Sequence, residues 1–76
     1  LKGVDAEIIE VEVKSESDLL GTKLKDLNFP KDSIVGGLTR DNEAHFPRGN
    51  FEFEEGDRVI VVTKKETKNT IESMFK

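Results

Sequence analysis

Residues 33–63 read SIVGGLTRDNEAHFPRGNFEFEEGDRVIVVT, and this stretch decides the fold of the chain. Residues that favour turns stand at 41–42, 47–49 and 55–57, where they separate short extended segments. We expect strands at 33–40, 43–47 and 58–63, and a brief extended piece at 51–53. Asp41-Asn42 predicts a hairpin turn, although the pair lacks the glycine of the strongest turn sequences. The run RVIVVT is expected to form the most buried strand.

The segment before this stretch predicts one more strand. In AEIIEVEV, at residues 6–13, apolar and acidic side chains alternate. Because successive side chains of a strand point to opposite faces, one face receives Ile9, Val11 and Val13. Ile8 falls on the other face with the glutamates. The same alternation within 33–40 assigns one face to three residues: Ile34, Gly36 and Leu38.

Two helices are predicted as well. Leu20, Leu24 and Leu27 repeat at the spacing of one helix face, and the sequence Phe29-Pro30 ends that helix. A second helix is expected at 66–75, with one apolar face made of Ile71, Met74 and Phe75. The order β-α-β-β-β-α predicts an α+β fold, a small and mainly antiparallel sheet of four to five strands with helices packed on it.

The composition describes one small domain over residues 1–76. Only 34% of the residues are hydrophobic and 37% are charged, so the core must be thin. The chain contains no cysteine, which excludes disulfides and thiolate zinc sites and leaves self-association as the remaining source of added stability. We therefore expect the chain to associate with copies of itself. The first residue is Leu1 rather than methionine, which suggests a domain taken from a longer protein.

Charge and hydropathy narrow the function classes. The net charge of −4 argues against a protein that binds a nucleic acid polymer, since such proteins present a basic face. The longest apolar run covers only residues 59–62, whereas a membrane helix needs about 20 residues. We expect no direct membrane insertion, no signal peptide and a cytoplasmic location.

Side chains that carry catalysis are scarce. There is one histidine, His45, and the serines lie in no pattern typical of a nucleophile. Most carboxylates alternate with apolar residues along predicted strands, as expected for a solvated face. The sequence therefore predicts neither an enzyme nor a metal site, and no cofactor is required.

A few residues around the predicted hairpin could still bind a ligand. Arg40 ends one strand, and His45, Phe46 and Pro47 lie across the turn, where they could hold a phosphate and stack on a base. The alternative is ordinary structural roles for each of them. Gly36-Gly37 indicates either a bulge or close packing, or a surface that a ligand approaches.

Motifs in a fixed order connect the chain with a known family. These are Leu20-Gly21-Thr22-Lys23-Leu24, a strand ending in Arg40, Pro47-Arg48-Gly49, and the run EEGDRVIVV at 54–62. With this pattern, residues 6–75 resemble the TrkA C-terminal domain (RCK_C), the regulatory C-lobe of potassium uptake and channel-gating proteins. The resemblance implies a non-enzymatic domain that follows a nucleotide-binding lobe and dimerises through its sheet and helix region.

The same resemblance implies a partner and a ligand. Domains of this family transmit ligand occupancy to a membrane potassium transporter or channel, which would place this one at the inner face of the membrane. Some members bind cyclic di-AMP at the dimer interface. Carried over, that site maps to Arg40, His45, Phe46 and Pro47, with Ile34 as apolar lining. His45-Phe46 departs from the small polar and aliphatic residues of such binders, so Phe46 either stacks on adenine or blocks the pocket. The alternatives are another host, such as an anion transporter or a transcription regulator, or a structural dimerisation domain without ligand.

Overall fold

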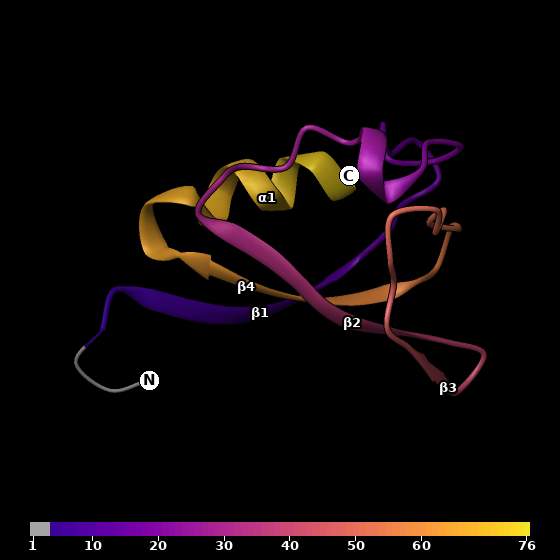
Figure 1. The fold of residues 1–76 in the computed structure, drawn as a ribbon, viewed down its shortest axis with the longest axis horizontal. Coiled ribbons are helices and arrows are strands. Elements are labelled where there is room, and N and C mark those ends of the chain that lie inside the picture. Colours follow the sequence, from indigo (N-terminus) through magenta and orange to yellow (C-terminus); the bar gives the residue numbers. More distant parts are fainter. Residues whose placement is uncertain (1–3) are drawn as a thin grey trace.

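A computed structural model describes residues 4–76 and shows an antiparallel sheet covered on one side (Figure 1). The strands are β1 (Ala6–Glu12), β2 (Ser33–Arg40), β3 (Glu43–His45) and β4 (Arg58–Lys64). Within the described residues, one α-helix, α1 (Lys68–Phe75), follows the last strand, and two short 3-10 helices are η1 (Leu24–Asp26) and η2 (Lys65–Thr67). The strand order in the described part is β1-β4-β2-β3. This arrangement confirms the predicted α+β class with a mainly antiparallel sheet.

Strand β4 contains the most buried side chains of any strand, as its apolar sequence predicts, and it pairs with a neighbour on each edge. It pairs with β1 from Ala6↔Lys64 to Glu12↔Arg58, and with β2 on its other edge. Val59, Val61 and Thr63 alternate along β4 and are buried on the side that faces α1. Because β4 is central, its alternation decides which face of each neighbouring strand is covered.

The core lies between the sheet, α1 and the long connections. Its buried apolar members are Val13, Leu19, Leu38, Phe53, Val59, Val61, Ile71 and Phe75. Phe75, at the end of α1, packs against Phe53 and Phe29 with ring centroids 6.0 and 6.3 Å apart. The predicted helix therefore forms, but its α-helical part begins only at Lys68.

The helix predicted around residues 20–27 is wrong. Only η1 forms there, and the preceding turn contains Gly21 with a φ of +78°. The N–H of Leu24 donates to the Phe51 carbonyl at 2.8 Å, and the N–H of Lys25 donates to the Gly49 carbonyl at 2.9 Å. In a helix these N–H groups would bond to carbonyls four residues earlier. Pairing with the 49–52 segment takes their place, and the leucines still pack against the core.

The hairpin after β2 is confirmed, and the segments after it are shorter than expected. Asp41 and Asn42 have φ angles of 52° and 65°, the left-handed pair that a type I′ turn requires. Strand β3 ends at His45, because Pro47 two residues later cannot donate to a ladder. The expected extended piece at 51–53 contributes only a bridge between Glu52 and Lys23.

A bulge at the glycine pair reverses the alternation within β2. Ile34 pairs with Val62, but the register shifts between Val35 and Gly37, so that Leu38 pairs with Val59. Ile34 is consequently 67% exposed on the open face, whereas Leu38 is 3% exposed in the core. The prediction that these two residues share one face is wrong, because it assumed an unbroken strand.

Candidate functional site

Arg40, the first residue predicted to bind a ligand, is held by a buried carboxylate. Its position two residues after Leu38 puts it on the covered side of the sheet, where it reaches Asp57. The Nε of Arg40 donates to Oδ1 of Asp57 at 2.8 Å, and its Nη2 donates to Oδ2 at 2.7 Å. The side chain of Asp57 is 1% exposed. This two-pronged geometry is the strongest form of an ion pair between these residue types.

Further contacts surround the guanidinium. The Nη2 of Arg40 also donates to the Glu52 carbonyl at 3.2 Å, and Nη1 lies 3.1 Å from Oε2 of Glu54. The guanidinium carbon stands 4.9 Å from the ring centre of Phe51. Arg40 therefore ties the end of β2 to the 51–57 loop, and the cluster of Arg40, Phe51, Glu54 and Asp57 is called the arginine cluster below.

The ion pair shifts the pKa values of both partners in opposite directions. The hydrogen bond with Asp57 raises the pKa of Arg40 above its usual value, although burial opposes the shift. Burial alone would raise the pKa of Asp57, but hydrogen bonds from Arg40 and from the Glu54 N–H, the latter at 2.9 Å, outweigh it. The pKa of this carboxyl thus lies below its usual value, and Asp57 stays charged at neutral pH.

His45 joins the arginine cluster at its edge. It stands opposite Leu38 in the β2–β3 register, so its side chain lies on the same covered side. Its ring centre is 6.2 Å from that of Phe51, against which the Arg40 guanidinium also packs. The structure therefore brings Arg40 and His45 together, as the hairpin pattern predicts.

Phe46 lies on the opposite, open side of the sheet and is 77% exposed. A Cβ atom built on Gly37 would stand 3.5 Å from Cδ1 of Phe46, so the ring packs directly over the glycine. A slot of about 270 Å³ borders this ring, with a largely apolar lining that includes Gly36, Ala44 and Ile60. The glycine pair forms a bulge, which is one of the two interpretations of the sequence, and it also lines this slot.

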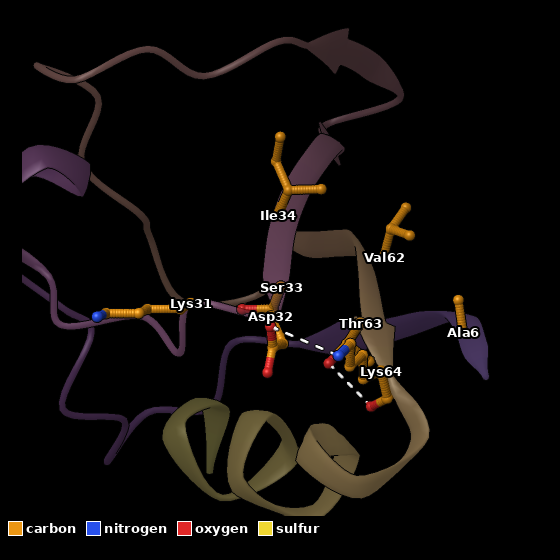
Figure 2. A pocket seen from close by; sticks show the side chains of 8 residues that line it. All are labelled: Ala6, Lys31, Asp32, Ser33, Ile34, Val62, Thr63 and Lys64. Carbon is orange, nitrogen blue, oxygen red and sulfur yellow. Dashed lines mark hydrogen bonds and ion pairs between the residues drawn. The ribbon is translucent and has the colours of Figure 1, made fainter.

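Pro47 and Ile34 line a groove of about 450 Å³ beside β2, together with Leu27, Phe29 and Arg48. Ile34 also borders a shallower pocket between Lys31 and Lys64, where Ile34 and Val62 point away from α1 (Figure 2). The five predicted site residues therefore divide between three surfaces. Arg40 and His45 share the first, Phe46 borders the second, and Ile34 and Pro47 share the third.

Sequence reasoning missed three members of the arginine cluster. The sequence predicts Phe51 in an extended piece, Glu54 on a solvated face and Asp57 in a turn. The turn sequence Gly56-Asp57 was the available signal, since an aspartate beside a glycine often bonds nearby backbone N–H groups. The pairing of Arg40 with Asp57 could not be predicted from local sequence, because the two residues are 17 positions apart in the chain.

Within residues 4–76, no cluster of three metal-binding side chains is present, and no helix is long and apolar enough to span a bilayer. The open face of the sheet instead carries exposed apolar side chains, among them Ile8, Ile34 and Phe46. Apolar patches on an otherwise polar surface indicate a contact with another molecule.

Comparison with known proteins gives a consistent set of relatives. The TrkA-C domain family matches residues 8–76. The chain is 37% identical over 76 residues to the Trk system potassium uptake protein TrkA homolog 2 of Methanosarcina mazei, covering all of this chain and 17% of that protein. It is 41% identical over 69 residues to the TrkA homolog of Archaeoglobus fulgidus, covering 91% of this chain and 16% of the relative. The chain thus spans about one sixth of the length of these relatives.

A solved structure agrees with the fold. It is described as "Structure of RCK domain with cda", and it superposes with a TM-score of 0.80 at 25% identity. The superposition covers 91% of this chain and 97% of that one. Agreement over nearly the whole of both chains shows that the strands and helix are arranged alike.

Proposed function

Because the chain belongs to the TrkA-C domain family, we propose that it is a regulatory domain of a potassium transport protein, in which ligand occupancy controls cation flux. The match over residues 8–76 is the observation that carries the proposal. The curated relatives are named for potassium uptake, and the solved relative is an RCK domain. The proposed role is regulatory rather than catalytic, and it acts at the cytoplasmic side of a membrane transporter or channel.

The proposed domain works as a homodimer joined through the open face of the sheet. Ile8, Ile34 and Phe46 are exposed there, together with the half-buried Ile60 and Val62. A stable interface buries about 800 Å² on each partner. The accessible surface of the whole chain is 5257 Å², so such a contact would need about one seventh of it. A second copy of the chain is the occupant that a thin core and an uncovered apolar face favour.

The proposed ligand is cyclic di-AMP, bound between the two copies. The exposed Phe46 ring over Gly37, on the open face where the copies would meet, suits a stacked base. The cation of Arg40 and the ring of His45 suit a phosphate, but they lie on the other side of the sheet, so a ligand that uses both must pass the edge strand β3. The solved relative is described as an RCK domain "with cda", which supports this choice. A ligand that binds one dimer arrangement more tightly than another shifts the population toward it, and that shift is the proposed signal.

Calorimetry with the purified chain tests the proposal. We expect saturable binding of cyclic di-AMP at one ligand per two chains, and none of ATP or cyclic di-GMP at the same concentrations. Phe46→Ala should weaken binding by about 5- to 150-fold, because base stacking on an aromatic ring contributes about 1–3 kcal/mol. Val4→Ala, which truncates an exposed apolar residue before β1 that belongs to no proposed interface, is the control and should bind as the wild type does.

A ligand-free dimerisation domain is the second candidate. The observation that favours it is the occupied state of Arg40, whose guanidinium already contacts two carboxylates and a backbone carbonyl. If cyclic di-AMP releases no heat while the chain sediments as a dimer, this second function replaces the first.

A further inference from the structure

Two carboxylates hold Arg40, and they differ in burial. Asp57 bonds Nε and Nη2 and is 1% exposed. Glu54 contacts the remaining nitrogen, Nη1, at 3.1 Å, and its side chain is 67% exposed. One side of the guanidinium is thus fixed inside the protein, and the other faces a carboxylate that water already reaches.

The two contacts respond differently to a competing anion. Removing Arg40 from Asp57 would leave a buried charge unpaired, which proteins tolerate poorly. An exposed ion pair is worth little, so the Glu54 carboxylate can be displaced easily. The backbone N–H of Glu54 donates to Oδ2 of Asp57 at 2.9 Å, which keeps this residue beside Nη1 even when its side chain turns away.

We infer that an anionic group of the ligand reaches Arg40 by replacing the carboxylate of Glu54 at Nη1, while Asp57 remains bound to Nε and Nη2. Glu54 then acts as a built-in competitor that sets the affinity of the site for phosphate. This inference rests on the proposed ligand site at Arg40 and His45, and it identifies Glu54 as the residue that regulates the affinity of that site. It also explains how Arg40 can serve the fold and the ligand together.

The test compares the wild-type chain with Glu54→Gln and with the control Glu55→Gln, which removes an equal charge from the neighbouring exposed residue. Each protein is titrated with cyclic di-AMP by calorimetry and with pyrophosphate by NMR, following the backbone amides of Arg40 and Phe51. We expect Glu54→Gln to tighten binding by about two- to fivefold, because the lost contact is an exposed ion pair. Glu55→Gln should change the affinity less than twofold.

The role of Asp57 has its own readout in the same samples. The Nε–H of Arg40 should stay protected from hydrogen exchange when pyrophosphate is bound, because its bond to Asp57 persists. Equal affinity of wild type and Glu54→Gln, or loss of the Nε–H protection, would overturn the inference. So would an absence of pyrophosphate binding to all three proteins. Pyrophosphate binding that tightens in Glu54→Gln, without any binding of cyclic di-AMP, would support the inference and reject only the proposed nucleotide.

Discussion

Replacing Arg40 by methionine keeps an apolar stem but removes the guanidinium that neutralises Asp57. Of the hydrogen bonds that the Asp57 carboxylate accepts from Arg40 and Glu54, only the one from the Glu54 N–H would remain. Breaking a buried ion pair by removing one partner costs about 3–5 kcal/mol. Arg40 is 21% exposed, so water can enter beside Asp57 in the variant, and we expect a loss near about 3 kcal/mol.

That loss is large for a chain of this size. At about 0.05–0.15 kcal/mol per residue, the whole domain has a free energy of unfolding of roughly 4–11 kcal/mol. Urea denaturation followed by circular dichroism at pH 7 measures the difference. Arg58→Met is the matched control, because Arg58 is exposed and its nearest carboxylate oxygen, on Glu12, is 3.9 Å away. The control should lose less than about 1 kcal/mol.

The effect should also depend on pH. In the wild type the pKa of Asp57 lies below its usual value, so the stability it contributes is present above about pH 4 and is lost as the pH falls through the folded-state pKa. In Arg40→Met the burial of Asp57 is no longer compensated, and its pKa should rise. As the pH is lowered, Asp57 then takes up a proton at a higher pH in the folded variant than in the unfolded chain. The difference in the free energy of unfolding between the wild type and Arg40→Met should therefore become smaller as the pH falls from 7 to 4. A gap that stays constant, or that equals the loss in Arg58→Met, would refute the reasoning.

Two further predictions concern the core and the open face. Phe75→Ala should lower the free energy of unfolding by about 3–5 kcal/mol, since it empties the space between α1 and the Phe29 and Phe53 rings, and urea denaturation should show a chain close to unfolding. Ile34→Glu should weaken the proposed homodimer at least tenfold in analytical ultracentrifugation, because it places a charge within the buried contact, while leaving the circular dichroism spectrum of the chain unchanged. Thr39→Glu, an exposed position on the same strand, measures how much any added charge on that face weakens the dimer, and an equal effect at both positions would argue against an interface centred on Ile34.

The candidate site was predictable to the extent that it depends on local sequence. Asp41-Asn42 predicts a hairpin, and a hairpin brings the end of one strand beside the start of the next, so the meeting of Arg40 and His45 follows. The identity of the carboxylate that pairs with Arg40 does not follow from the local sequence. Asp57 reaches Arg40 only after the 51–57 loop has closed over the end of β2, a contact that no spacing rule contains.

Two wrong predictions have a common cause in long-range pairing. The leucines at 20, 24 and 27 have helical spacing, but backbone bonds to Gly49 and Phe51 outweigh that local preference. The alternation through Gly36 is strand-like, but pairing with β4 introduces a bulge there and sends Ile34 to the open face. In both places a distant segment supplied the hydrogen bonds, and local periodicity cannot anticipate those.

The sequence by itself determined the sheet and its central strand, because alternation in β1 and β4 and a two-residue turn are local properties of the chain. It also determined the terminal helix, whose apolar residues can be buried only against that sheet. The tertiary structure alone decided which face each residue of β2 presents and which carboxylate holds Arg40. Those outcomes depend on register and loop closure, in which segments far apart in the chain compete for the same backbone groups and the same cation.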